Sequence, residues 1–357
     1  MSMKGFLVLE DGEVYVGTTI GAPNDAWGEV VFHTAVTGYQ DILTDPAYRG
    51  QIVVLTYPLV GNYGIDPTEL VEKQPHVRGL VVKEFCVFPH NWRSQESLAS
   101  FLRRSGVVGL QGLDTRALTR HLRDKGPMRG IITHNIDNLA AVLERLRRLP
   151  ILEEQNLVAE VATKHPYAAQ EGARQVNVID LGGAAEILAA LKDFPVGVTV
   201  FPPTYPLEEV VRHNPSLTVI SNGPGAPGAA PIGDLAQIMA KTPLFGVGLG
   251  HQLLAMAAGA KVVKMARGHR GHNLPVKEEG GSVFISRQSH GYVVDEGSLA
   301  GTDLAITHRN LNDGTVEGLR HRRLPVASVQ YRLPIGHRAP GEENPLCRFL
   351  HELGISS

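Results

Sequence analysis

The chain has little cysteine and no long apolar run. Its 357 residues include two cysteines, Cys86 and Cys347. An extracellular disulfide scaffold would need more, which favours a reducing cytoplasm. No apolar stretch reaches the roughly 18–20 residues that cross a bilayer, and the first residues mix a short apolar run with acidic side chains, unlike a signal peptide. We therefore expect a cytoplasmic protein that neither crosses nor binds a membrane.

The chain also lacks a strong charge of either sign. The formal net charge is −2, so there is no electrostatic case for binding nucleic acid or an anionic membrane. The 15 histidines are scattered, with no pair at metal-binding spacing beside a carboxylate, so we expect no metal site. What remains is an ordinary globular composition, with 20% charged and 43% hydrophobic residues, and a length that suits two domains.

The first half of the chain is predicted to be rich in strands. The turn Asp11-Gly12 joins two short apolar segments, and further strands are expected at 28–33 and 51–57. Helices are expected at 97–104, 114–124 and 139–148. From about 150 to 174 the hydrophobic periodicity fades. We therefore expect a β-rich α/β domain over 1–150, a linker over 151–173 and a second domain over 174–357.

The second half alternates short apolar strands with helices. This pattern predicts an α/β domain with a mostly parallel sheet covered by helices on both faces. In such sheets a ligand site lies at the carboxyl ends of the strands. The loops expected at that edge are 181–183, 221–225 and 246–252.

The segment from Leu244 to Leu254 has the pattern of a nucleophile elbow, a sharp turn between a strand and a helix. Gly246 and Gly250 flank the apex, where small residues are needed because backbones crowd together. A working enzyme carries serine or cysteine at the apex, over the start of the helix. Here the apex is Gly248, which has no side chain to attack with. A plain tight turn explains the spacing equally well.

Longer segments carry a resemblance to a known family. Residues 245–254 (FGVGLGHQLL) resemble the nucleophile motif of class I glutamine amidotransferases, and Ser221–Gly225 (SNGPG) resembles a second loop of that family. The small subunit of carbamoyl-phosphate synthetase is similar to this chain in segments 28–46, 56–64, 91–98, 113–120, 268–276 and 307–318. These matches span nearly the whole sequence, so the chain is identified as a member of that family.

The resemblance implies a fold and a role. It implies an N-terminal domain that contacts a large subunit, followed by a class I glutamine amidotransferase-like domain. In the family the small subunit hydrolyses glutamine, and the ammonia passes to the large subunit, which makes carbamoyl phosphate for arginine and pyrimidine biosynthesis. The large subunit would be this chain's partner, and ATP and magnesium would belong to that subunit, leaving no cofactor in this chain.

The family's catalytic groups are replaced at the matching positions. The nucleophile position is Gly248, the base position is Arg332 and the position of the orienting acid is Pro334. An arginine stays protonated and cannot act as a base. A shifted alignment brings in His337 but loses the Gln330 anchor and offers no carboxylate. The two cysteines are expected to be packed thiols rather than nucleophiles.

The family's substrate-binding positions are partly replaced as well. Ala47 stands for a serine, Ser289 for an asparagine and Ala226 for an aspartate, while Ala184 and Glu186 replace a lysine and an asparagine. The full set of expected substrate-binding positions is Ala47, Gly223, Gly225, Leu249, Gln252, Ser289, Gly291 and Tyr292. Most of the retained residues act through backbone groups or serve the turn itself, so structure explains their presence as well as binding does.

Three functions are compatible with these residues. The first is a non-hydrolysing small subunit that supports synthesis from free ammonia. The second is an unorthodox glutaminase in which His251 or His290 activates water. The third is a regulatory protein that binds glutamine or an anion without turnover, with Arg332 projecting into the vacated site.

Overall fold

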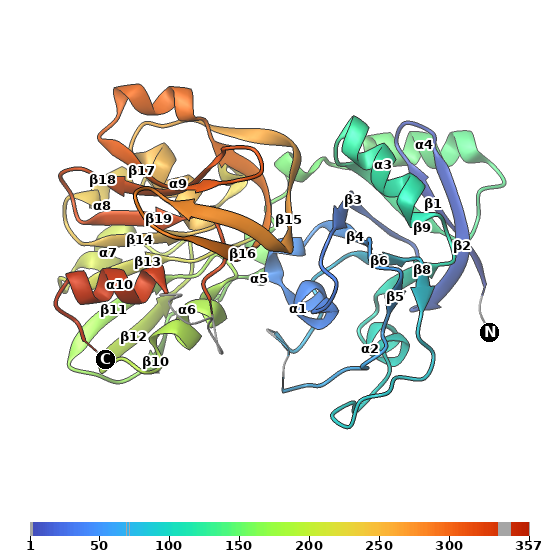
Figure 1. Ribbon diagram of the computed structural model, residues 1–357, viewed down its shortest axis with the longest axis horizontal. Coiled ribbons are helices and arrows are strands. Elements are labelled where there is room, and N and C mark those ends of the chain that lie inside the picture. Colours follow the sequence, from blue (N-terminus) through green and yellow to red (C-terminus); the bar gives the residue numbers. More distant parts are fainter. Residues whose placement is uncertain (1–2, 69, 71, 335–343, 357) are drawn as a thin grey trace. The chain divides into compact units, whose positions relative to one another are not determined.

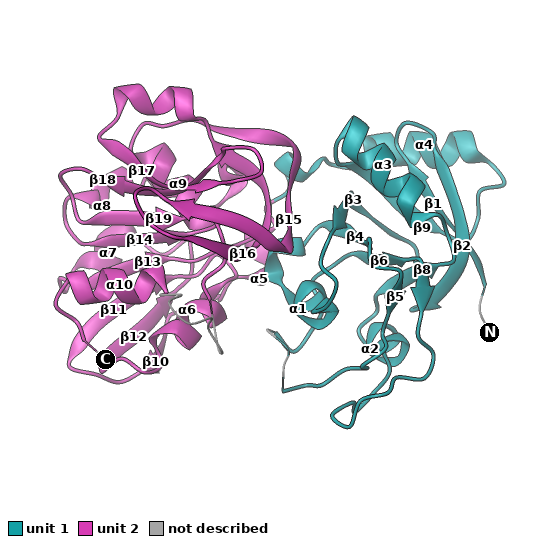
Figure 2. Ribbon diagram, in the orientation of Figure 1, with its two compact units in different colours: residues 1–155 teal, residues 156–357 magenta. Residues whose placement is uncertain are grey.

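The computed structural model describes residues 3–68, 70, 72–334 and 344–356. The chain divides into two compact units, Met1–Gln155 and Asn156–Ser357, and each is described by itself (Figure 2). The segment predicted as a linker carries structure. It contains η2 (Leu152–Glu154), α5 (Val158–Val161) and β10 (Tyr167–Gln170). The side chains of β10 are mostly exposed, which explains why this strand has no hydrophobic periodicity.

The N-terminal unit is built on a closed barrel of seven described strands (Figure 1). Apolar side chains point inward because the strands alternate, and Leu7, Val54 and Leu110 lie in the core. In barrel order the strands are β1 (Lys4–Leu9), β2 (Val14–Gly21), β8 (Val108–Gln111), β6 (Gly79–Val82), β4 (Gln51–Leu55), β3 (Ala26–His33) and β9 (Met128–Thr133). Two short strands, β5 (Leu59–Val60) and β7 (Glu84–Phe85), pair outside the barrel.

Helices cover this barrel. They are α1 (Tyr39–Thr44), η1 (Pro46–Tyr48), α2 (Leu98–Arg104), α3 (Thr115–Lys125) and α4 (Leu139–Arg148). The predicted start of α3 is confirmed, since the Asp114 side chain accepts a hydrogen bond from the Ala117 N–H at 2.9 Å. Its buried face, Leu118 and Leu122, packs against the barrel core. The β-rich α/β character expected for this half is therefore confirmed.

The C-terminal unit contains a sheet of ten described strands (Figure 1). Its centre is parallel, as expected from the alternation of strands and helices. An antiparallel half follows, which the sequence pattern did not predict. In sheet order the strands are β10, β12 (Val196–Phe201), β11 (Arg174–Ile179), β13 (Leu217–Ile220), β14 (Leu244–Val247), β19 (Val326–Val329), β18 (Val316–His321), β17 (Leu304–Asn310), β15 (Val262–Glu278) and β16 (Val283–Val294).

Helices cover both faces of the parallel part. Ile187 of α6 and Phe349 of α10 pack into one core with the sheet, whereas Val210 of α7 and Leu254 of α9 pack into another. The helical segments of this unit are α6 (Ala184–Leu191), α7 (Leu207–Val211), η3 (Pro227–Ala229), α8 (Ala236–Met239), α9 (Leu249–Ala257), η4 (Glu296–Gly301) and α10 (Pro345–Glu352). The predicted covered sheet is confirmed.

Among the residues that the structure describes, none of the helices combines the length and the apolar character needed to cross a membrane.

Candidate functional site

The turn between β14 and α9 is as sharp as the glycine spacing indicated. Gly248 has φ +55° and ψ −110°, a conformation that residues with side chains rarely adopt. A Cβ on Gly246 would lie 2.6 Å from the Gly250 carbonyl oxygen, and one on Gly250 would lie 2.2 Å from the Ile220 carbonyl oxygen. Both flanking positions therefore exclude larger residues because the crossing backbones leave no room.

The three predicted loops meet at the carboxyl ends of β11, β13 and β14. The Ser221 hydroxyl oxygen accepts hydrogen bonds from the N–H groups of Leu181, at 2.8 Å, and Gly183, at 3.3 Å. The next residue, Asn222, reaches the turn at Gly248. The three loops expected at one edge of the sheet therefore lie together.

The Asn222 side chain fills the space in front of the apex. Its Oδ1 accepts a hydrogen bond from the Leu249 N–H at 3.0 Å. A Cβ on Gly248 would lie 2.1 Å from this oxygen and 2.4 Å from the Asn222 Cγ. In elbow enzymes the N–H that follows the nucleophile stabilises the oxyanion. The Asn222 amide thus fills the space that a nucleophile's side chain would occupy. It also accepts a hydrogen bond from the N–H that would stabilise an oxyanion.

Arg332, at the base position, is held in an ion pair. Its Nε and Nη2 each lie 3.1 Å from Oε2 of Glu186, whose side chain is only 2% exposed. The other Glu186 oxygen accepts a hydrogen bond from the Leu333 N–H. The Pro334 carbonyl accepts one from the Asn344 amide at 3.3 Å, and Pro334 offers no carboxylate. The pairing counts against the expectation that Arg332 attracts an anion, because Glu186 already matches its charge.

The pair and the apex belong to one region of the unit. The Gly248 N–H donates to the Val329 carbonyl at 2.9 Å, so the apex lies beside the end of β19. Arg332 follows three residues after that strand, and Glu186 comes from the first turn of α6. The sequence marked Glu186 only as a replacement. Its pairing with Arg332 was missed. The usable signal was that both residues replace family motif residues and that their charges are opposite.

Two of the expected substrate-binding residues hold each other. The Gln252 side-chain amide donates to the Tyr292 carbonyl at 3.3 Å and to Gln330 Oε1 at 3.1 Å. These bonds tie α9 to β16 and to the chain after β19. Ser289 and Gly291 lie on β16 before Tyr292, and both are half-buried. Gln252 therefore has a structural use whether or not a substrate binds.

The remaining expected positions have local structural reasons. A Cβ on Gly223 would lie 2.3 Å from the Leu181 carbonyl oxygen, and Gly225 has φ +87°. Leu249 and Ala226 are buried. Ala47 is buried in η1 of the N-terminal unit, where its N–H donates to Asp45 Oδ1 at 2.9 Å. His337 lies outside the described residues.

Neither histidine considered as a water-activating base is open to a substrate. His251 is fully buried, its Nδ1 lies 2.8 Å from the Ser328 hydroxyl, and burial lowers its pKa to about 3. His290 is buried as well, with Nδ1 2.9 Å from the Tyr292 carbonyl and Nε2 3.2 Å from Gln288 Oε1. Both rings are enclosed by the fold, which leaves the unorthodox glutaminase without support.

The two cysteines form no disulfide, and each thiol contacts a backbone carbonyl. Cys347 is buried in α10, where its thiol contacts the Ala190 carbonyl at 3.7 Å. Cys86 is half-buried, and its thiol contacts the Phe88 carbonyl at 3.3 Å. The expectation of packed side chains fits Cys347 better than the half-buried Cys86.

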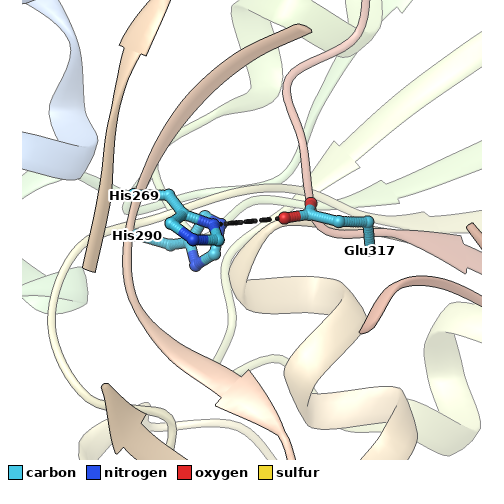
Figure 3. A group of neighbouring side chains, drawn as sticks. All are labelled: His269, His290 and Glu317. Carbon is cyan, nitrogen blue, oxygen red and sulfur yellow. Dashed lines mark hydrogen bonds and ion pairs between the residues drawn. The ribbon is translucent and has the colours of Figure 1, made fainter. Parts of the chain in front are cut away.

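A buried group of His269, His290 and Glu317 was missed by sequence reasoning (Figure 3). The two histidines face each other across β15 and β16, so they are adjacent in space although they are distant in sequence. His269 Nδ1 lies 3.2 Å and His290 Nε2 lies 3.8 Å from Oε1 of Glu317, whose side chain is fully buried. The spacing of histidines in the sequence gave no sign of this grouping, because the pairing of β15 with β16 creates it.

Comparison with known families matches both units. The family described as "Carbamoyl-phosphate synthase small chain, CPSase domain" matches residues 7–132. The family described as "Glutamine amidotransferase class-I" matches residues 177–338.

Curated relatives match over nearly the full length. A carbamoyl phosphate synthase small chain from Syntrophotalea carbinolica is 44% identical over 98% of this chain and 96% of the relative. One from Caldanaerobacter subterraneus is 45% identical over 92% of this chain and 90% of the relative. A small chain named as pyrimidine-specific, from Halalkalibacterium halodurans, is 44% identical over 96% of this chain and 95% of the relative.

Proposed function

The chain belongs to the carbamoyl-phosphate synthase small-chain family, and from that premise we propose that it is a small chain without glutaminase activity. It binds a large synthetase chain and supports carbamoyl phosphate synthesis from free ammonia. In this role it is a pseudoenzyme that acts as the structural half of a heteromer in the cytoplasm. The product enters arginine and pyrimidine biosynthesis, and the relative named as pyrimidine-specific supports the pyrimidine route.

The single observation that carries this proposal is the filled apex at Gly248. Hydrolysis of glutamine through an elbow needs a nucleophile and a donor that stabilises the oxyanion. Gly248 supplies no nucleophile, and the neighbouring Leu249 N–H is taken by Asn222. An incoming carbonyl would have to displace that amide and would still meet no attacking group.

The base position supports the same conclusion. A guanidinium cannot accept a proton at physiological pH. Arg332 is moreover fixed to a carboxylate that is itself buried. Loss of the nucleophile, the base and the orienting acid together leaves no part of the usual catalytic path.

A large-chain partner has support in the N-terminal unit. Phe88 and Trp92 are 82% and 88% exposed, and Val87 beside them is 60% exposed. They lie between β7 and α2, at and next to the family-like segment 91–98. Exposed aromatic side chains of this kind are typical of protein interfaces. We assign ATP and magnesium to the large chain. The N-terminal unit supplies a surface for the large chain to contact.

The alternative is a regulatory protein that binds glutamine or an anion without turnover. It has less support, because Arg332 is already paired with Glu186 and Gln252 is bonded within the fold. Ala47 has no side-chain hydrogen-bonding group, so one expected glutamine contact is missing.

The test is a reconstitution with a large synthetase chain from one of the relatives' organisms. Carbamoyl phosphate formation is measured with glutamine and, separately, with ammonium as the nitrogen source. We expect synthesis with ammonium alone, and co-elution of the two chains in size-exclusion chromatography. The matched control is the relative's own small chain, which should support both nitrogen sources.

Glutamine-dependent synthesis above the level of the large chain alone would refute the loss of glutaminase. Failure to co-elute would refute the partnership. Titration calorimetry with glutamine addresses the alternative, which requires binding at millimolar concentration without turnover.

A further inference from the structure

Three buried side chains from three strands of the C-terminal unit converge on one point. His269 of β15 and His290 of β16 are directly opposite each other in the antiparallel register, and Glu317 of β18 reaches them from the other side (Figure 3). One ligand-type atom from each residue lies within 4.8 Å of the other two. The exposed fractions are 9%, 8% and 0%. None of these residues belongs to the vacated elbow.

The strand that carries His269 is shaped to bring it there. The pairing of β15 with β16 is interrupted between Lys264 and His269 and again between Gly271 and Leu274. Gly268, just before the histidine, has φ +64°. Irregularities of this kind redirect side chains and occur next to functional sites.

The outer nitrogen of each ring is anchored to an acceptor. His269 Nε2 donates to Asp313 Oδ2 at 2.9 Å, and Asp313 is itself fixed by the Thr315 N–H and hydroxyl. His290 Nδ1 donates to the Tyr292 carbonyl at 2.9 Å. With protons on these outer nitrogens, the inner nitrogens present lone pairs to the centre. Histidines that ligate metals are held in this way.

The centre itself is rich in acceptors. His269 Nδ1 lies 3.2 Å from Glu317 Oε1, and His290 Nε2 lies 3.8 Å from the same oxygen. Gln288 Oε1 lies 3.2 Å from His290 Nε2, and the other end of that amide donates to Ser286. The Asn310 amide approaches His269 Nδ1, Gln288 Oε1 and Glu317 Oε1, but it has only two protons.

One more buried acceptor adds to this excess. Glu317 Oε2 is buried without a hydrogen-bond partner among the described residues. A buried carboxylate that faces lone pairs is costly unless a cation joins it.

We propose that His269, His290 and Glu317 form a binding site for a divalent transition-metal ion, with zinc as the expected occupant. Two imidazoles and a carboxylate are a common zinc ligand set. Ligands of a tetrahedral zinc ion lie about 3.3–3.5 Å apart, from metal–ligand distances of roughly 2.0–2.2 Å. The two histidine-to-carboxylate distances, 3.2 and 3.8 Å, need only small shifts to meet that geometry, and the three ligand atoms lie within 4.8 Å of one another. Gln288 Oε1 is placed to be the fourth ligand.

A site closed by four protein ligands is structural rather than catalytic. It would tie β15 and β16 to β18. Strand β16 also carries Ser289, Gly291 and Tyr292, so the ion would fix the strand on which three expected glutamine-binding positions lie. The proposal does not depend on whether the chain hydrolyses glutamine.

The test uses the full chain without a histidine tag, stripped by a chelator and then incubated with zinc alone. Bound zinc is measured by atomic emission after desalting, and unfolding is measured by calorimetry with free zinc present. We expect one zinc ion per chain and a Tm higher by roughly 5–10 °C at a hundredfold excess over Kd. The same site should take cobalt and give the intense visible absorption of tetrahedral coordination.

Variants locate the ion. Glu317→Gln keeps the shape but removes the charge, and it should retain no zinc. Asp313→Asn changes a carboxylate that is partly exposed and not a ligand, so it should fold and bind zinc about 10–100-fold more weakly. His321→Gln, outside the cluster, is the control and should bind like the unchanged chain.

Some results would overturn the proposal. They are no retained zinc in the unchanged chain, equal zinc in all variants, which indicates adventitious binding, or bound zinc without any change in Tm. Each would mean that the cluster is a network of hydrogen bonds with a second proton on a histidine. If Glu317→Gln fails to fold, the affinity of Asp313→Asn decides the question.

Discussion

The C-terminal unit holds two polar centres that differ in what their side chains leave unpaired. At the elbow, Arg332 is matched by Glu186, and the Leu249 N–H is matched by Asn222. At the histidine cluster, acceptors outnumber donors, and Glu317 Oε2 is buried without a partner among the described residues. A centre whose groups satisfy each other has little left to offer a ligand. A centre with an excess of one kind of group still has a binding capacity.

The largest expected effect comes from breaking the ion pair between Glu186 and Arg332. Glu186→Ala removes the buried carboxylate that Arg332 Nε and Nη2 both contact, so we expect a loss of about 3 kcal/mol in the free energy of unfolding. Urea denaturation measures it. The control is the double variant Glu186→Asn with Arg332→His, which removes both charges and should lose less. A loss below about 0.5 kcal/mol for the single variant would mean that solvent already screens the pair.

The next effect probes the amide that fills the apex. Gly248→Ala places a Cβ 2.1 Å from Asn222 Oδ1 at a backbone φ of +55°, so we expect a loss of roughly 2 kcal/mol. Removing the amide with Asn222→Gly should recover part of that loss in a double-mutant cycle. Strictly additive effects would show that the Asn222 amide moves aside without cost.

An effect that acid brings out concerns two buried histidines that lie outside the histidine cluster. Burial lowers the pKa of His251 to about 3 and that of His308 to about 4. Because these values lie below the roughly 6.5 of a free imidazole, the unfolded chain takes up protons first. Stability is therefore complete above about pH 6.5 and is lost as the pH falls toward 4, by about 1 kcal/mol per pH unit for each histidine.

Denaturation curves at several pH values measure this slope. His308→Gln should reduce it, whereas His321→Gln should leave it unchanged. An unchanged slope in His308→Gln would mean that acid weakens the unit through other groups.

The smallest effect separates two neighbours on β16. Ser289 is half-buried, so Ser289→Ala should change the free energy of unfolding by less than about 0.5 kcal/mol. Gln288 beside it bonds to Ser286 and to the cluster, so Gln288→Ala should cost roughly 2 kcal/mol. Equal losses for the two variants in thermal denaturation would mean that Gln288 contributes no more to stability than Ser289 does.

Local patterns in the sequence were enough for several helices and strands and for the elbow. The spacing of Gly246, Gly248 and Gly250 predicts a crowded turn. Glycine is needed there because a Cβ would collide with atoms of neighbouring segments. Short apolar runs likewise located β1 and β4, whose side chains are almost all buried.

What could not be predicted depends on strand register and on partners across the fold. His269 meets His290 only because β15 and β16 pair in one register, which one sequence does not reveal. Glu186 meets Arg332 because α6 lies next to the chain after β19. The antiparallel half of the sheet was missed because its long strands β15 and β16 alternate irregularly between exposed and buried residues.

The amide at the apex also has a consequence for engineering a nucleophile into this turn. A cysteine at position 248 would place its Cβ against Asn222 and would find no base at Arg332. We therefore expect Gly248→Cys to lower stability without creating a glutaminase. A working nucleophile here needs changes at the base position and room beside Asn222 in addition to the thiol itself.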